Sequence, residues 1–146
     1  MALKDVISEP NKRPSVVDDC VRLIDEEVKG KGGLSGVAVK GAFTVVKAIK
    51  PGIIREAADR LLDPFVEKLD PFYSKWKAGA SGPFDGFLRG RKTEVANALL
   101  GVTDERAARA DNQTLKKAYK KLRPKAVGHV ESAVPGIARI IEKHAP

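Results

Sequence analysis

The sequence predicts an all-α fold: a single compact bundle of about five to seven helices with proline-kinked segments. Apolar residues recur three and four positions apart in several segments, and breaks rich in glycine and proline separate these segments. The chain has 146 residues, of which 42% are hydrophobic, so one domain can bury a core without disulfide bonds. We expect one helical domain over residues 15–146, preceded by a flexible arm over residues 1–14.

Two helices are expected before residue 51. Ser15 should cap the first, whose apolar stripe consists of Val17, Cys20, Val21, Ile24 and Val28. Because Cys20 lies on this stripe, we interpret it as a small core residue and not as a reactive thiol. The second helix should open at Ser35 or Gly36, with an apolar side made of Val39, Phe43, Val46 and Ile49. The β-branched run 44–46 leaves a strand as the alternative.

The segment 53–77 contains Asp-Pro-Phe twice, at 63–65 and 70–72, within an unbroken helical stripe. Both prolines fall on the polar side, where water can satisfy the carbonyls that each proline leaves free. We expect one kinked helix, or several short ones, with Phe65, Phe72 and Trp76 facing the core. Asp-Pro-Phe is also a docking motif in eukaryotic endocytic proteins, but the phase of the stripe favours a core role.

The rest of the chain is less regular. Residues 78–92 are rich in glycine and are expected to form a packed loop and the hinge of the fold. A short helix should follow over 93–100, ended by Gly101, and Thr103 should cap the next helix, which breaks near 111–112 and resumes to 123. The last helix should run from Pro124 to about residue 144, and the Pro-Gly step at 135–136 should kink or split it.

No catalytic or metal-binding pattern stands out. The two histidines are fifteen residues apart, Cys20 has no partner, and the glycines at 30–36 lack the Gly-Lys-Ser/Thr of a phosphate loop. We therefore expect no metal, no cofactor and no enzyme activity. The apolar runs are too short to span a bilayer, and the N-terminus lacks the apolar region of a signal peptide, so we expect a cytoplasmic protein.

A basic segment is the one feature that resembles a site. The net charge is +8, and residues 101–146 alone carry ten bases against five acids. An anion- or nucleic-acid-binding surface is predicted at Lys116, Lys117, Lys120, Lys121, Arg123 and Lys125, extended by Arg89, Arg91 and Lys92. The alternative is a solvated face that only keeps the protein soluble.

Several short motifs resemble a family of small uncharacterised bacterial helical proteins, a domain of unknown function. The motifs are Leu34-Ser35-Gly36 followed by Val39-Lys40, then Pro51-Gly52, then residues 99–104 with Arg106-Ala107, and finally Tyr119 with Leu122-Arg123. The resemblance covers residues 15–145. It implies a bacterial, cytoplasmic and mostly helical domain, and it transfers no catalytic residue.

Three functions are compatible with these patterns. The first is a non-enzymatic interaction or scaffold protein that binds an unknown protein partner or itself, because the stripes at 53–76 and 127–141 offer much apolar helix surface. The second is non-specific nucleic-acid binding by the basic segment. The third is binding to an acidic membrane surface, or of an apolar ligand in a cavity lined by Phe65, Phe72, Trp76, Phe84 and Phe87.

Overall fold

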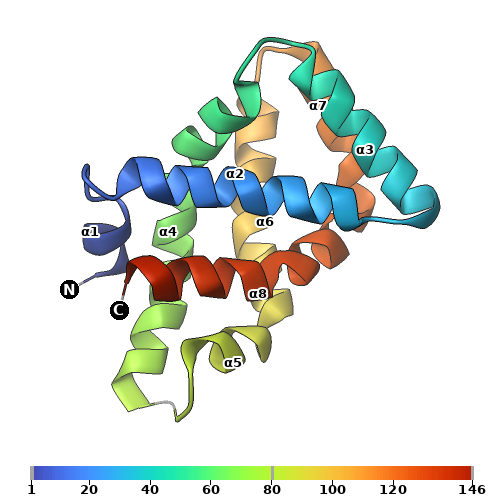
Figure 1. The fold of residues 1–146 in the computed structure, drawn as a ribbon. Helices are drawn as coiled ribbons and strands as arrows, with labels where there is room; N and C mark the ends of the chain where they lie inside the picture. Colours follow the sequence, from blue (N-terminus) through green and yellow to red (C-terminus); the bar gives the residue numbers. More distant parts are fainter. Residues whose placement is uncertain (1, 80, 146) are drawn as a thin grey trace.

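The computed structural model describes residues 2–79 and 81–145, without the side chains of Leu34 and Ser35. Within this part of the chain the fold is all-α, as predicted, with eight α-helices, one 3-10 turn and no β-strand (Figure 1). The helices are α1 (Leu3–Ile7), α2 (Arg13–Gly30), α3 (Gly33–Lys47), α4 (Ile53–Gly79), α5 (Phe84–Arg89), α6 (Lys92–Arg109), α7 (Gln113–Leu122) and α8 (Ala126–His144), and the 3-10 turn is η1 (Arg123–Lys125).

The helices form two layers and one projecting pair. Helices α2 and α8 lie side by side and cross over α4 and α6, while α3 and α7 pack together at one corner of the molecule (Figure 1). The core fills the space between the layers, because each helix turns its apolar stripe inward. Its members include Val16 and Val17 of α2, Leu62 and Val66 of α4, Val95 and Leu99 of α6, and Val134 and Ala138 of α8.

Helix α4 contains both copies of Asp-Pro-Phe. It runs from Ile53 to Gly79 without interruption, so the segment 53–77 is one helix that contains both prolines. The predicted inward role of the aromatic residues is confirmed, because Phe65, Phe72 and Trp76 pack against the core. Bends at Pro64 and Pro71 stay a prediction.

The arm predicted for residues 1–14 is instead a docked segment over residues 2–14. Residues 3–7 form helix α1, which packs against α4, and the side chains of Leu3 and Ile7 are buried in the core. Two apolar residues four positions apart were too weak a pattern to predict a helix. The partner of this short helix lies more than fifty residues away in the sequence.

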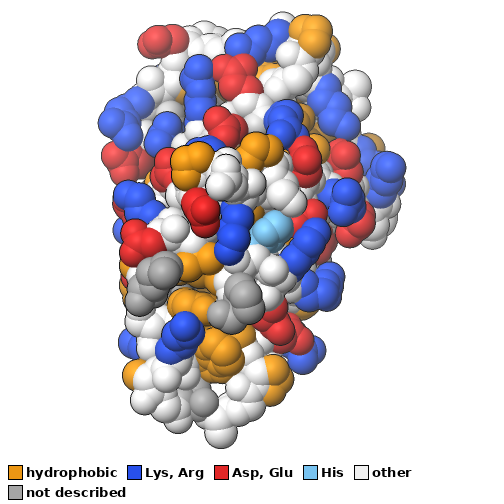
Figure 2. Space-filling view, turned by 60° about the vertical axis from the view of Figure 1, so that its left-hand side comes forward, with side chains coloured by type: hydrophobic (Ala, Val, Ile, Leu, Met, Phe, Trp, Pro, Cys, Tyr) orange, Lys and Arg blue, Asp and Glu red, His pale blue; other side chains and the backbone are white. Residues whose placement is uncertain are grey.

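The aspartates of both Asp-Pro steps hold the N-terminal segment. Asp70 Oδ1 accepts the backbone N–H of Leu3 at 2.7 Å, and Asp63 Oδ1 accepts the hydroxyl of Ser8 at 2.7 Å and a guanidinium N–H of Arg13 at 2.9 Å. The polar side of α4 is therefore covered in part by the chain itself. Side chains of both charges alternate over the face that comes forward in Figure 2.

The segment 78–92 and helix α6 differ from the prediction. Residues 84–89 form helix α5, in which Phe84 and Leu88 are buried, so the segment packs as expected but is not one loop. Helix α6 continues through Gly101, and Thr103 lies inside it, where its hydroxyl is 3.1 Å from the carbonyl oxygen of Leu100. Packing of α6 against α8 and α4 outweighs the cost of one helical glycine, about 1 kcal/mol.

Smaller differences concern helix ends. Helix α2 begins two residues before Ser15, and α3 begins at Gly33, while the side chain of the predicted cap Ser35 lies outside the described atoms. The strand alternative at 44–46 is wrong, because these residues lie in α3. The break near 111–112 is confirmed. Helix α8 begins at Ala126, after η1, and continues through Pro135, so it is not split.

Candidate functional site

Helix α7 carries the basic segment predicted from the sequence. Asn112 caps it, because its side-chain oxygen accepts the backbone N–H of Leu115 at 3.1 Å. Ala118 is buried, and Leu115 and Leu122 are half-buried on the same side of the helix. With 3.6 residues per turn, the lysines at 116–117 and 120–121 therefore project on the other sides of α7.

Five of the six basic side chains in this segment have no partner. The ammonium groups of Lys116, Lys117, Lys120, Lys121 and Lys125 make no ion pair or hydrogen bond within the described residues. Arg123 differs, because its Nε and Nη2 donate to the two carboxylate oxygens of Asp104 at 2.8 and 3.0 Å. The charge of Arg123 is therefore offset by Asp104, whereas the five lysine charges are free to attract an anion.

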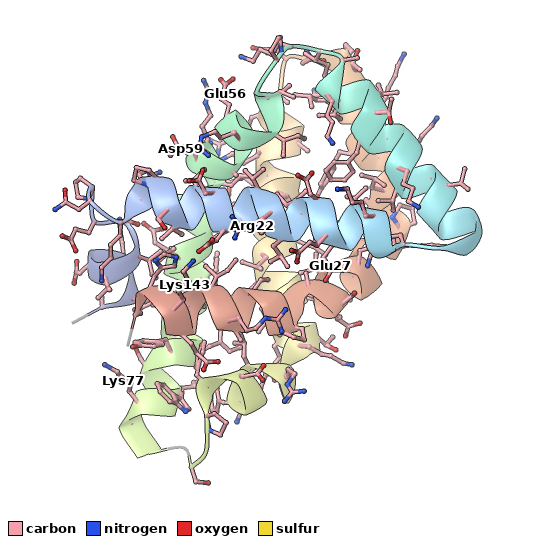
Figure 3. All side chains as sticks on the ribbon, in the orientation of Figure 1. Arg22, Glu27, Glu56, Asp59, Lys77 and Lys143 are labelled. Atoms are coloured by element: carbon pink, nitrogen blue, oxygen red, sulfur yellow. The ribbon has the colours of Figure 1, made fainter. Side chains whose placement is uncertain are left out.

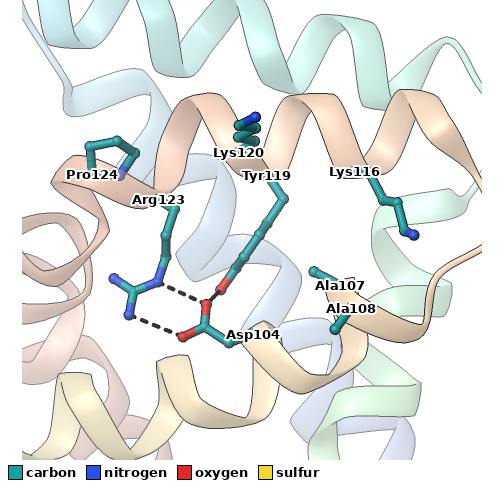
Figure 4. Close-up of a pocket in the computed structure, with 8 residues that line it drawn as sticks. All are labelled: Asp104, Ala107, Ala108, Lys116, Tyr119, Lys120, Arg123 and Pro124. Carbon is teal, nitrogen blue, oxygen red and sulfur yellow. Dashed lines mark hydrogen bonds and ion pairs between the residues drawn. The ribbon is translucent and has the colours of Figure 1, made fainter.

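An open groove runs between the C-terminal half of α6 and helix α7 (Figure 4). Its volume is about 750 Å³, and we call it the α6–α7 groove. Its lining consists of Asp104, Ala107, Ala108, Lys116, Tyr119, Lys120, Arg123 and Pro124. Most of the exposed lining is apolar. The groove thus has an apolar floor and two unpaired lysines at its side.

A hydrogen-bond network fixes one end of the α6–α7 groove. The Tyr119 hydroxyl donates to Asp104 Oδ1 at 2.5 Å (Figure 4). The same hydroxyl lies 2.7 Å from Thr103 Oγ1. Hydrogen bonds from Arg123 and Tyr119 hold the pKa of the Asp104 carboxyl below its usual value. Burial and the Asp104 charge raise the pKa of Tyr119. The aspartate thus stays ionised, and the network joins α6 to α7.

The α6–α7 groove divides the lysines of α7 into two pairs. Lys116 and Lys120 line the groove, whereas Lys117 and Lys121 are exposed and do not contribute to it. The two pairs lie on the same helix and carry the same charge. They therefore provide matched variants for any binding experiment on this helix.

The predicted extension of the basic surface does not join it. Arg89 and Arg91 lie in and just after α5, at the opposite end of the molecule from α7 (Figure 1). Arg89 pairs with Asp85 at 3.2 Å, and the Arg91 guanidinium lies over the ring of Phe87 at 3.8 Å from its centroid. Lys92 begins α6 beside them. The structure thus separates these three residues from the six at 116–125.

Of the five aromatic residues predicted to line a cavity, Trp76, Phe84 and Phe87 lie against one another, while Phe65 and Phe72 pack against the core. The Trp76 and Phe84 ring centroids are 5.3 Å apart, and Tyr73 lies 5.5 Å from Phe84. Phe84 is buried and Phe87 lies against it at 6.5 Å. Hydrophobic side chains gather at this lower end of the molecule in Figure 2. None of these rings lines the α6–α7 groove.

A second polar cluster, which no sequence motif predicted, lies between α2 and α8. Asp19 and His144 are both buried, and their Oδ2 and Nε2 atoms are 2.7 Å apart. Lys143 Nζ lies 3.0 Å from the same carboxylate, and Figure 3 shows Arg22 and Lys143 on facing sides of the two helices. Burial opposes ionisation of Asp19, but hydrogen bonds from His144 and Lys143 outweigh it and lower its pKa. This cluster fastens the end of α8 to α2.

Comparison with known proteins adds a family to this description. No curated protein and no solved structure matches the chain. A family model matches residues 3–145. The chain belongs to DUF6918, a family of unknown function. The DUF6918 match confirms the resemblance to a domain of unknown function and includes α1, so the docked N-terminal segment lies within the family region.

Among the described residues, no helix is long and apolar enough to cross a membrane. The same residues contain no group of three or more His, Cys, Asp or Glu side chains that would hold a metal ion. The α6–α7 groove, with the unpaired Lys116 and Lys120 in its lining, is the candidate site of this DUF6918 chain.

Proposed function

We propose that this DUF6918 protein is a non-enzymatic interaction protein whose α6–α7 groove binds an acidic, partly apolar segment of a partner protein. The observation that carries the proposal is the combination of an apolar floor with the unpaired lysines Lys116 and Lys120. A partner segment with carboxylates beside an apolar side chain would match both features. A cytoplasmic location in a bacterium is part of the proposal and rests on the sequence alone.

The local charge supports an acidic partner. Residues 101–125 carry eight bases and three acids. Two of the three acids are offset, because Asp104 pairs with Arg123 and Glu105 pairs with Arg109 at 2.8 Å. The positive charge also reaches α8, where burial, Lys31 and Lys125 together lower the pKa of His129. An approaching acidic segment would be attracted before it makes contact.

The shape of the α6–α7 groove supports a polypeptide over nucleic acid or an enclosed small molecule. Ala107 and Ala108 are small, so the backbone of a partner can approach α6 closely. The groove is wide open to solvent, whereas small-molecule sites usually enclose most of their ligand. Duplex DNA would present phosphates to the lysines but nothing apolar to the floor. Nucleic-acid binding is therefore the second candidate, supported only by the five free lysines.

Fluorescence anisotropy with three labelled probes tests the proposal. The probes are a short amphipathic peptide of Glu and Leu, the same peptide with Gln in place of Glu, and a short DNA duplex. Each is titrated at about 50 and about 200 mM salt, because diffuse phosphate contacts weaken steeply over this range. We expect the acidic peptide to bind the wild-type protein and the Gln peptide to bind at least about tenfold more weakly.

The matched lysine pairs identify the site. Lys116→Gln with Lys120→Gln should weaken binding of the acidic peptide about tenfold, while Lys117→Gln with Lys121→Gln should change it less than about threefold. Ala107→Leu keeps the charge and fills the groove. It should therefore weaken binding of the acidic peptide and leave binding of the DNA duplex unchanged. Equal losses for both lysine pairs, together with tighter binding of DNA than of peptide, would instead establish a nucleic-acid surface.

A further inference from the structure

The two sides of the α6–α7 groove are both faces of α-helices. On α7 the lining includes positions 116, 119, 120 and 123, and on α6 it includes positions 104, 107 and 108, so in both helices the positions are three or four apart. At 1.5 Å per residue, the lining of α7 extends for about 10 Å, or about two turns. The α6–α7 groove is thus a valley between two helices, and such a valley has the shape that receives the side-chain ridges of a third helix.

The backbone of the two walls favours a helical partner over an extended one. The backbone N–H and C=O groups of a helix bond along its own axis, so the walls offer no row of free groups such as the edge of a sheet presents. An extended segment on the apolar floor would leave backbone groups without partners, which costs free energy. A helical segment satisfies these groups internally and presents only side chains to the groove.

The place of the charges in the groove also favours a helix. Lys116 and Lys120 share the lining with Ala107 and Ala108, so the positive charges lie next to the apolar floor. Successive residues of a helix are turned by about 100°, and a stripe of carboxylates can therefore run directly beside an apolar stripe. In a strand successive side chains point to opposite faces, so carboxylates that alternate with apolar residues would point away from the groove.

The cations of α7 recur with the rise of a helical turn. Lys116 and Lys120 are four positions apart, which separates their Cα atoms by about 6 Å along the helix axis. Arg123 lies one further turn along, where Asp104 occupies its Nε and Nη2. Its Nη1 makes no ion pair or hydrogen bond within the described residues. A partner helix aligned with α7 would match the two lysines with carboxylates at positions i and i+4.

The apolar floor of the groove is held in place by the fold itself. The Tyr119 side chain crosses from α7 to α6, where its hydroxyl donates to Asp104 and lies 2.7 Å from Thr103 Oγ1 (Figure 4). A ring that is already held loses little side-chain freedom when a partner covers it. Ala107 and Ala108 have no rotamers to lose. The floor is therefore preorganised for a rigid partner such as a helix.

We propose that the partner segment of the α6–α7 groove is an amphipathic α-helix of at least about two turns, with carboxylates at positions i and i+4 beside an apolar stripe. This inference rests on the proposed function, to which it adds a conformation and a charge spacing. The apolar stripe lies on Ala107, Ala108 and the ring of Tyr119. The two carboxylates pair with Lys116 and Lys120.

Three labelled peptides of identical Glu, Leu and Ala composition test the inference. In the first, Leu recurs at helical spacing and two Glu lie four positions apart beside the Leu stripe. The second keeps the Leu stripe and moves both Glu to the opposite side of the helix. The third places Leu at every second position, as in a strand. We expect the first to bind at least about tenfold more tightly than the other two in fluorescence anisotropy, and to gain helical circular dichroism signal on binding.

A charge reversal locates the bound helix. Lys116→Glu with Lys120→Glu should weaken binding of the first peptide at least about tenfold, and the same peptide with Lys in place of both Glu should then bind this variant more tightly than wild type. The control is Lys117→Glu with Lys121→Glu, which makes the same change of charge outside the groove and should alter binding less than about threefold. All are measured at about 200 mM salt, where distant charges are largely screened, and circular dichroism of the free variants checks their fold.

Three outcomes would overturn the helical partner while the proposed function stands. They are equal binding of the first and third peptides, equal binding of the first and second peptides, and binding of the first peptide without a gain in helical signal. Absence of binding by all three acidic peptides, or equal losses for the two charge-reversal variants, would overturn the proposed function as well. The failure of the helical partner and the failure of the groove as an acidic-segment site therefore give different results.

Discussion

The carboxylate of Asp70 accepts the backbone N–H of Leu3 at 2.7 Å, across 67 positions of sequence. This contact links the second Asp-Pro step of α4 to the first turn of α1. Leu3 is also fully buried beneath it. The N-terminal segment therefore combines an apolar anchor with a capping carboxylate that comes from another helix.

Truncation of Leu3 should destabilise the whole fold. We expect Leu3→Ala to lower the free energy of unfolding by about 3 kcal/mol, because it leaves a cavity under α1. The control is Lys4→Gln, which removes an exposed ion pair with Glu67 and should cost less than about 1 kcal/mol. Urea unfolding followed by circular dichroism measures both. Similar values for the two variants would mean that α1 does not contribute to the core.

Two glycines of α3 should respond to alanine in opposite directions. A Cβ at Gly36 would meet the backbone carbonyl carbon and oxygen of Lys31 at 2.7 Å, while a Cβ at Gly41 would meet nothing within 4 Å. We expect Gly36→Ala to destabilise the protein by about 1–3 kcal/mol through strain at the turn between α2 and α3. Gly41→Ala should stabilise it by about 0.5–1 kcal/mol through helix propensity. Thermal unfolding of the two variants decides the signs.

The buried carboxylate of Asp19 should make stability depend on acid. Its pKa in the folded protein is lowered, because hydrogen bonds from His144 and Lys143 outweigh the effect of burial. Its contribution is therefore complete above the ordinary range of aspartate and is lost as pH falls through the folded pKa. We expect Asp19→Asn to lower the melting temperature at pH 7, with a difference from wild type that shrinks towards about pH 3.

The neighbouring Asp18 provides the control for this pH dependence. Its exposed carboxylate pairs with Arg55 on the surface. Asp18→Asn should cost less than about 1 kcal/mol at pH 7, as exposed ion pairs usually do. If Asp19→Asn were as mild as Asp18→Asn, the cluster between α2 and α8 would have no role in stability.

The thiol of Cys20 should be almost unreactive in the folded protein. Burial, with a smaller contribution from the Asp19 charge, raises its pKa to about 11 from 9.0. The thiolate fraction at pH 8 is then about 100-fold lower than for an unperturbed thiol, and the thiolate is the reacting form. Ellman's reagent should react slowly with the native protein and rapidly in urea. Fast labelling of the native state would contradict the packing of this side chain.

The helical architecture was predictable wherever the apolar stripe is long. In residues 53–77 the apolar stripe keeps the helical spacing for about seven turns, so helix α4 could be predicted even though it contains two prolines. The prediction failed where packing overrides local preference. In the sequence, Gly101 predicted the end of a helix, yet it lies inside α6. The helix continues because neighbouring residues such as Leu100 and Val102 are buried against the rest of the fold.

The candidate site was predictable only in part. The lysines of α7 are visible as a run of charge, and the spacing showed which side of that helix is apolar. The floor of the α6–α7 groove was not visible, since Ala107 and Ala108 have no distinctive pattern and α6 meets α7 only in the folded chain. The same limit applies to Asp19 and His144, which are 125 positions apart in sequence.

The two ends of the described chain lie close together. Helix α1 contacts α8, and Lys12 Nζ donates to the carbonyl oxygen of His144 at 3.0 Å. In Figure 1 both ends are on the side of the molecule away from α3 and α7. Attachment of either end to a sensor chip would therefore orient every molecule alike. The α6–α7 groove would then face the flow, so the acidic peptide and the DNA duplex can be compared on one immobilised layer.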